Sequence, residues 1–156
     1  MDVEVVRSAR RKKTVQARVV DGKLRVSIPA TMTRDEEAHW VDVMRERVLR
    51  KSMVGEIDLS VRAELLATRL GLELPRTIEW SERQKTLWGS CTVADGAVRI
   101  STRVSGYPPW VVDYVIVHEL AHLSVANHSN AFWEIVSRYE HADRARGYLE
   151  AKSDGL

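Results

Sequence analysis

Residues 110–124 constrain the fold more than any other segment of the chain. Their sequence, WVVDYVIVHELAHLS, is apolar around nearly the whole circumference of a helix. A helix without a polar face is stable only where other elements cover it, so we expect it in the core of a domain. Pro108 and Pro109 precede it, and proline is tolerated in a first helical turn. Its few polar side chains are costly to bury and therefore informative. They are Asp113, Tyr114, His118, Glu119 and His122.

Within this helix, the pattern H-E-x-x-H at residues 118–122 predicts a metal site. Histidines at i and i+4 lie about 40° apart on one helix face, so the imidazoles of His118 and His122 can reach one ion. Glu119 points to the side, toward a water on the ion. Zinc with three protein ligands keeps a fourth position open and lowers the pKa of a bound water to about 7. A carboxylate can take that proton and return it to a leaving amine. The motif therefore predicts a zinc-dependent hydrolase with Glu119 as its catalytic residue.

A third ligand is needed, and His128 is the first candidate. In a continuous helix it would lie about 9 Å along the axis from His122, so the helix must end between them. We expect Asn127 to cap the helix in a left-handed conformation and Ser129 to begin a helix over residues 130–139. The spacing H-E-x-x-H-x5-H matches the three histidines of the long metzincin motif, without its glycine. The rival third ligands are Glu134, Glu140 and His141.

The N-terminal residues 1–30 are predicted to form a β region. Val-rich segments cover residues 3–7 and 14–20. Asp21-Gly22 is a strong hairpin signal, and residues 23–28 after it alternate strictly between polar and apolar side chains. We therefore expect a small antiparallel sheet.

A helical region is predicted over residues 33–71. A capping box, Thr33–Glu36, opens a helix that ends near Lys51. A second helix is expected over residues 59–70, with Gly71 as its C-terminal stop. The side chains expected to face inward are Val41, Met44 and Val48 in the first helix and Val61, Leu65 and Leu66 in the second.

The catalytic core is predicted over residues 77–156, where strands precede the apolar helix. Because 156 residues is the size of one ordinary domain, we expect a single metallopeptidase domain over residues 1–156. The strands expected in the core cover residues 77–80, 86–91 and 97–101.

Charge and cysteine content indicate the compartment and possible partners. The formal net charge is +2, but residues 1–25 hold eight basic and three acidic side chains. Such a basic end could bind nucleic acid, or it could be the solvated edge of a hairpin. The single cysteine, Cys91, fits a reducing compartment, and no signal peptide or membrane-length apolar run is visible. We expect a cytoplasmic protein.

Four segments of the chain together resemble the YgjP-like, SprT-related zinc metallopeptidases. They are Lys85–Cys91, Val112–Leu123, Asn127-His128-Ser129 and Phe132-Trp133. The likeness is close over residues 83–135 and looser at Arg7–Arg11. It implies an α+β, minimal zincin-like fold, in which a small antiparallel sheet packs on a buried H-E-x-x-H helix. It also implies zinc on three histidines, His118, His122 and His128.

The resemblance extends to kinship with the Spartan-type proteases that digest proteins crosslinked to DNA. The alternative function is therefore a DNA-associated protein whose basic N-terminus confines proteolysis to DNA-bound proteins. Its candidate nucleic-acid contacts are Arg10, Arg11, Lys12 and Lys13. A non-catalytic zinc module is a third possibility, but such a site has no use for Glu119 and closes with four protein ligands.

Substrate contacts are less constrained by the sequence. The resemblance implies a protein or peptide substrate. In zincins the substrate pairs with an edge strand, which we expect here at residues 97–101. A group that stabilises the oxyanion is also expected. Trp88 and Trp133 are interpreted as walls of the core, with contact to the substrate as the alternative. The candidates for the oxyanion group are Tyr114, Tyr139 and His141.

Overall fold

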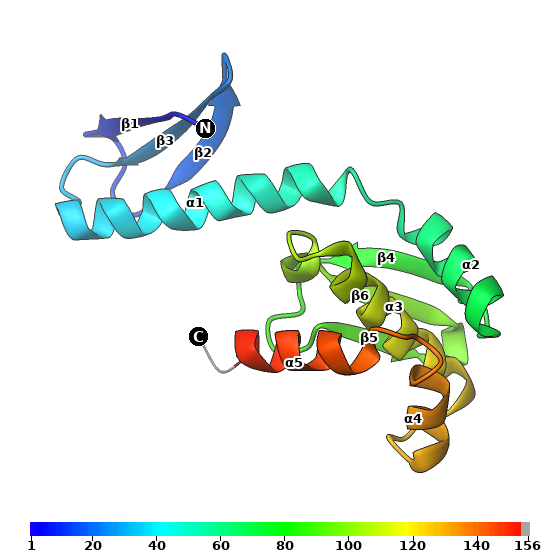
Figure 1. Ribbon diagram of the computed structural model, residues 1–156. Coiled ribbons are helices and arrows are strands. Elements are labelled where there is room, and N and C mark those ends of the chain that lie inside the picture. The colour runs from blue at the N-terminus through cyan, green and yellow to red at the C-terminus, as the bar shows by residue number, and fades with distance from the viewer. Residues whose placement is uncertain (154–156) are drawn as a thin grey trace. The chain divides into compact units, whose positions relative to one another are not determined.

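The computed structural model describes residues 1–153, which contain two three-stranded sheets and several helices (Figure 1). Contacts within the chain divide it into two units, Met1–Ser52 and Met53–Leu156. The boundary falls inside one helix, α1 (Arg34–Val54). A single metallopeptidase domain over residues 1–156 therefore stays a prediction.

The first unit has a sheet in which β3 (Lys23–Pro29) lies between β1 (Val3–Ser8) and β2 (Gln16–Val20). The expected hairpin joins β2 to β3, and Asp21 and Gly22 have φ values of 51° and 75°, as a two-residue primed turn requires. The sheet is mixed instead of purely antiparallel, because β1 reaches the other edge of β3 and pairs with it in parallel. Its buried side chains Leu24, Val26 and Ile28 alternate along β3 and form a core with Met44 of α1.

The start of α1 follows the capping box. The amide of Glu36 donates to Oγ1 of Thr33 at 3.2 Å, and the amide of Thr33 donates to Oε2 of Glu36 at 3.0 Å. Two amides that the helix cannot satisfy are thus bonded by side chains. The expected inward stripe is confirmed, since Val41 and Val48 pack beside buried Met44.

In the second unit, β6 (Ala97–Ser101) is the central strand between β4 (Thr77–Ser81) and β5 (Gly89–Thr92). It is parallel to β4 and antiparallel to β5. The expectation that residues 97–101 form an edge strand is therefore wrong, because both sides of β6 are already paired. The predicted strand over residues 86–91 starts only at Gly89, so the edge beside the apolar helix is the short strand β5.

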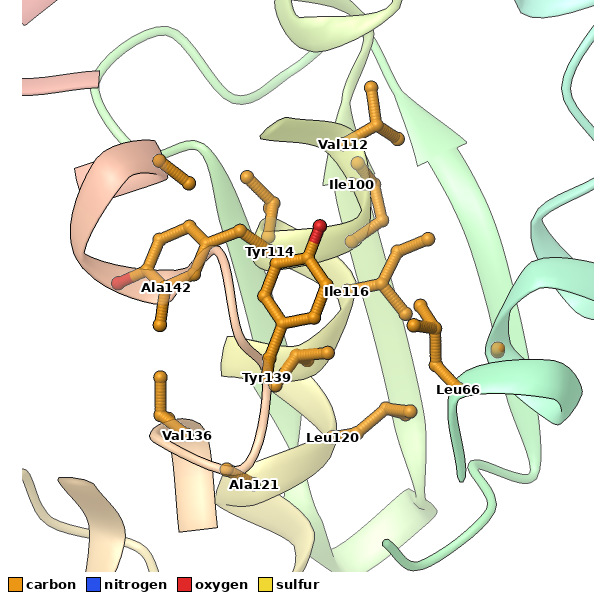
Figure 2. Packing of buried hydrophobic residues seen from close by; sticks show 14 of the residues in the cluster. Leu66, Ile100, Val112, Tyr114, Ile116, Leu120, Ala121, Val136, Tyr139 and Ala142 are labelled. Atoms are coloured by element: carbon orange, nitrogen blue, oxygen red, sulfur yellow. The ribbon is translucent and has the colours of Figure 1, made fainter. Parts of the chain in front are cut away.

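The predicted core helix is α3 (Pro109–Ser124), which contacts α2, β5, β6, α4 and α5. These helices are α2 (Leu59–Leu70), α4 (Asn130–Val136) and α5 (Ala142–Ser153). Two short 3-10 helices, η1 (Val93–Asp95) and η2 (Thr102–Val104), flank β6. Figure 2 shows Ile116 of α3 beside Leu66 of α2 in the buried cluster. Burial on all sides explains why α3 has almost no polar residues.

The inward face of α2 differs from the expected one. Its bounds and the left-handed Gly71 stop agree with the prediction, and the side chain of Asp58 caps its first turn. Leu66 is buried as expected, but Val61 and Leu65 are 50% and 56% exposed. The buried residues are Leu59, Ala63, Leu66 and Ala67, which follow a three-to-four-residue repeat on the opposite side of the helix. Two of the four residues on that side are small alanines, Ala63 and Ala67.

One ion pair joins α2 to α3. Arg62 donates from Nε to Oδ1 of Asp113 at 3.0 Å and pairs through its second nitrogen with Oδ2. Asp113 is buried, so its carboxylate depends on this bidentate partner.

Arg62→Ala is expected to lower the free energy of unfolding by about 2 kcal/mol, because it leaves a buried carboxylate unpaired. Arg69→Ala is the matched control on the same helix, since Arg69 pairs with Glu140 at 3.6 Å on the surface. Its loss should cost less than about 1 kcal/mol. Urea denaturation of both variants measures the difference, and equal losses would contradict this assignment.

Among residues 1–153, no helix has both the length and the apolar character needed to span a membrane. The buried residues of the second unit centre on α3 and its neighbours. This core holds the H-E-x-x-H helix rigidly, so the side chains at its C-terminal end have fixed positions.

Candidate metal centre

The chain reverses direction directly after α3, as a third ligand at residue 128 requires. The break is confirmed, but its expected cause is wrong. Within residues 1–153, Asp21 is the only residue other than glycine with a positive φ, so Asn127 is not a left-handed cap. Val125 ends α3 instead, in an extended conformation with φ −134° and ψ 111°. Ser129 then precedes α4, which ends at Val136, short of the expected residue 139.

This turn brings three imidazoles together. The ring centroids of His118, His122 and His128 lie 4.8–5.3 Å apart. One nitrogen from each ring lies within 4.8 Å of the others. Nε2 of His118 and Nε2 of His128 are 3.3 Å apart. These three are the only group of His, Cys, Asp or Glu side chains in residues 1–153 arranged to hold a metal ion.

Backbone and aromatic contacts orient the three rings. Nδ1 of His122 lies 3.1 Å from the carbonyl oxygen of Val125, so this nitrogen donates and Nε2 remains a free acceptor. Phe132 of α4 is fully buried and its ring stacks on that of His122, with centroids 4.4 Å apart. Trp133 stacks on His128 at 5.8 Å. The extended Val125 therefore both ends the helix and fixes the His122 ring.

Burial favours the neutral form of two of these imidazoles, those of His118 and His122. Burial lowers the pKa of His118 to about 4, with smaller contributions from His122, His128 and Arg146. Burial also lowers the pKa of His122, opposed by its bond to the Val125 carbonyl. Neutral imidazole is the form that binds a metal ion.

The carboxyl group of Glu119 lies beside the histidines and is almost fully enclosed. The residue is 5% exposed, and burial raises the pKa of its carboxyl to about 7. Gly89, at the start of β5, lies against it. A Cβ added to Gly89 would be 2.9 Å from Cγ and 3.0 Å from Oε1 of Glu119. The glycine thus leaves the space in which the carboxyl group sits.

Glu119→Gln is expected to stabilise the metal-free protein at high pH. Folding raises the pKa of the carboxyl from 4.5 to about 7. Below pH 4.5 both states are protonated and Glu119 costs nothing; between pH 4.5 and 7 the carboxyl ionises in the unfolded state but not in the folded one, so the folded state loses stability over this range. At pH 8 with chelator, the variant should exceed wild type by on the order of 3 kcal/mol in urea denaturation.

That difference should nearly vanish at pH 4.5. Glu134→Gln, an exposed site on α4, is the control and should stay within about 0.5 kcal/mol of wild type at both pH values. A stability gain for Glu119→Gln that is the same at pH 4.5 and pH 8 would contradict a raised pKa in the folded protein.

A pocket of about 530 Å³ opens beside His118 and Glu119. Its walls come from residues 86–89, from α3 and from the C-terminal helix α5. Tyr114 lines it, and its ring centroid is 6.0 Å from that of His118. Burial raises the pKa of Tyr114 to about 12, so its hydroxyl stays protonated and can donate. The pocket offers space for a ligand on one side of the histidine cluster.

The other candidates from the sequence lie apart from this cluster. The hydroxyl of Tyr139 donates to the carbonyl of Trp110 at 2.7 Å and is already used. Glu140 pairs with Arg69 at 3.6 Å and with His141 at 3.9 Å. None of the rival third ligands belongs to this group of three histidines. They are Glu134, Glu140 and His141.

The four basic residues considered for nucleic acid lie in the loop between β1 and β2 of the first unit. Arg10, Lys12 and Lys13 are exposed. Arg11 is half-buried and donates to Oγ1 of Thr14 at 3.1 Å and to Oε1 of Gln16 at 2.8 Å, so it holds the loop together. Nucleic-acid binding by this loop stays a prediction.

A family model described as YgjP-like, metallopeptidase domain matches residues 32–151. The chain belongs to the YgjP-like family of metallopeptidases. The resemblance found in the sequence is thereby confirmed, and family membership supports a peptidase that carries a metal ion and acts on proteins or peptides. The match begins after the basic loop of the first unit. No curated protein matches the chain.

Two solved structures share the fold of this YgjP-like chain. The metallopeptidase zymogen of Pyrococcus abyssi abylysin matches with a TM-score of 0.54 and 22% identity, covering 61% of this chain and 94% of its own. The metallopeptidase zymogen of Methanocaldococcus jannaschii jannalysin has a TM-score of 0.53, 20% identity and coverages of 62% and 97%. These likenesses confirm the α+β, minimal zincin-like fold.

Two pocket residues of the YgjP-like domain were missed by the sequence reasoning. Gly89 stands in the Trp88-Gly89-Ser90 segment that carried the family resemblance. A glycine inside a predicted strand is a signal that another group approaches the backbone closely. Arg146 lies on the polar surface of α5, and no local pattern separates it from other helix arginines. Only the fold brings it to the pocket.

Proposed function

We propose that the chain is a zinc-dependent metallopeptidase in which His118, His122 and His128 bind the ion and Glu119 acts on the attacking water. One observation carries the proposal. Three imidazoles converge at the end of a buried helix, beside a carboxyl group whose pKa burial raises to about 7. Membership of a metallopeptidase family supports peptides and proteins as substrates.

One pair of donor atoms, on His118 and His128, has the spacing of two ligands of a tetrahedral zinc ion, and the third histidine has a nitrogen within 4.8 Å of them. Two nitrogens bound to one zinc at 2.0–2.1 Å lie about 3.4 Å apart when the angle is tetrahedral. Nε2 of His118 and Nε2 of His128 are 3.3 Å apart, and Nε2 of His122 is left free by the bond of Nδ1 to Val125. Neutral imidazole is a common zinc ligand, and three protein ligands are typical of catalytic zinc sites.

A zinc ion held there would lower the pKa of a water and polarise the scissile carbonyl. Glu119 accepts a proton from the attacking water as its oxygen bonds to the carbonyl carbon. The same carboxyl then donates that proton to the leaving nitrogen as the C–N bond breaks. A pKa near neutrality suits both directions of transfer. Tyr114, protonated and lining the pocket, is the candidate donor to the oxyanion.

Gly89→Ala is expected to lower peptidase turnover about tenfold or more, because the new methyl displaces the Glu119 carboxyl from its position. Overpacking should also cost about 1–3 kcal/mol of unfolding free energy. Gly106→Ala is the control, since its Cβ would meet only Sδ of Met53 at 3.5 Å, an ordinary contact. Unchanged turnover in Gly89→Ala would show that Glu119 is not confined there.

Metal removal and restoration tests the proposed function. Protein stripped with a chelator should cleave no peptide in a library read by mass spectrometry, and one equivalent of zinc should restore cleavage. Magnesium should restore none, since imidazole ligands favour transition metals and zinc. Cleavage that persists in the stripped protein, or that zinc fails to restore, would overturn the proposal.

A further inference from the structure

Arg146 on α5 lines the same pocket as His118 and Glu119 on α3. The pocket is lined by His118 and Glu119 on α3 and by Arg146, Leu149 and Glu150 on α5. The helix α5 therefore supplies part of the wall of the pocket into which His118 and Glu119 open. Arg146 has no part in the chemistry assigned to Glu119, so its presence there needs a separate explanation.

An aromatic ring holds the guanidinium in place. Cζ of Arg146 lies 4.2 Å from the ring centroid of Trp133, and Trp133 itself stacks on His128 at 5.8 Å. An arginine over an indole face keeps its N–H donors in the plane of the guanidinium, pointing away from the ring. The same tryptophan thus links the position of Arg146 to that of His128 and leaves the donors of the arginine available.

These donors lack an anionic partner in the described part of the chain. Across residues 1–153, no carboxylate lies within 4.0 Å of the Arg146 guanidinium, although Glu150 and Asp143 are on the same helix. By contrast, Arg62 and Arg69 elsewhere in this unit pair with acids of the protein itself. A preoriented, unpaired guanidinium at a pocket wall is suited to an anion from outside.

We propose that Arg146 binds a carboxylate of the substrate, so that the enzyme prefers peptides with a carboxylate next to the scissile bond. This inference rests on the proposed peptidase function. The planar fork of arginine matches the two oxygens of a carboxylate, and such charge-assisted pairs are both stronger and more directional than neutral ones. The carboxylate can be the free C-terminus of the peptide or the side chain of an aspartate or glutamate.

Matched peptides separate the two sources. One pair has the same sequence with a free or an amidated C-terminus, and the other has an internal glutamate or glutamine. With zinc-loaded wild type, kcat/KM for the carboxylate member of one pair should exceed that for its amide partner about tenfold. The pair that shows this ratio identifies the carboxylate as the C-terminus of the peptide or as a side chain.

Variants on α5 then assign the preference to one residue. Arg146→Gln should abolish the tenfold ratio while changing kcat/KM for the amide peptide less than about threefold, and Arg146→Lys should retain part of it. Arg144→Gln is the matched control. Arg144 is on α5 like Arg146, and its Cζ lies 4.2 Å from the ring centroid of Trp110, but it does not line the pocket. It should keep the full ratio.

A binding measurement separates this inference from the proposed function. Intrinsic tryptophan fluorescence, to which Trp133 contributes, can follow the binding of each peptide to zinc-loaded Glu119→Gln, with and without Arg146→Gln. About tenfold tighter binding of the carboxylate peptide, lost with Arg146→Gln, is the expected result. The carboxylate site would be overturned, even in an active peptidase, if both peptides of a pair bound equally tightly. It would also be overturned if Arg146→Gln weakened the binding of both peptides by the same factor. A wild type that binds selectively but cleaves nothing would overturn the peptidase function alone.

Discussion

Glu119→Gln should retain a full equivalent of zinc and lose at least about a thousandfold in kcat. The three histidines are unchanged, and glutamine has nearly the same shape, so the fold and the ion-binding group persist. What disappears is the group that takes a proton from water and delivers it to the leaving nitrogen. General acid–base groups typically contribute 10²- to 10⁴-fold, and Glu119 is expected to serve in both steps.

The measurement combines metal analysis of the purified variant with single-turnover peptide cleavage. Glu134→Gln is the control, because this carboxylate on α4 is exposed and lies outside the histidine cluster. Near-normal turnover in Glu119→Gln would refute the assigned role. Loss of both zinc and turnover would show that Glu119 is a ligand of the ion instead.

His128→Ala should weaken zinc binding by about a hundredfold or more. Loss of a residue that merely orients a ligand typically costs 10- to 100-fold in metal affinity, so loss of a ligand should cost at least as much. His128 is exposed on the turn between α3 and α4, which makes the fold tolerant of its removal. Competition with a colorimetric chelator measures the affinity.

The rival ligands supply the controls for this prediction. Alanine at Glu134, Glu140 or His141 should leave zinc affinity within about twofold of wild type, since none of them joins the described histidine group. If His128→Ala binds zinc as wild type does and one rival variant fails, the third ligand has been misassigned.

The local signals in the sequence were strongest where one residue type has one structural use. The Thr33–Glu36 capping box, the Asp21-Gly22 turn and the Gly71 stop each follow from a specific backbone requirement, and each appears in the structure. The same holds for the core position of α3, because a helix without a polar face has no stable place at the surface.

Predictions failed where several residues can perform one task. A helix can end without a left-handed residue, and here Val125 does so in an extended conformation, in place of the expected Asn127. Likewise, the inward face of α2 depends on what packs against it, which the sequence of α2 alone does not contain. Its alanines Ala63 and Ala67 allow close packing, while Val61 and Leu65 remain exposed.

The residues of the candidate site also fall into two groups, those that the sequence identifies and those that only the fold brings to the site. His118, Glu119 and His122 belong to one helical motif and could be found without a structure, and the need for a chain reversal led to His128. Gly89 and Arg146 reach the pocket from a strand and a helix far away in the sequence. Such residues are brought together only by tertiary packing, so no spacing rule could identify them.

X-ray absorption at the zinc edge, on protein loaded with one equivalent of zinc, tests the central claim most directly. The account predicts a four-coordinate ion with three imidazole nitrogens at about 2.0–2.1 Å and one oxygen from water. It also predicts that His128→Ala reduces the imidazole count to two. A sulfur ligand from Cys91, a carboxylate in place of one imidazole, or an imidazole count that His128→Ala leaves unchanged would contradict it.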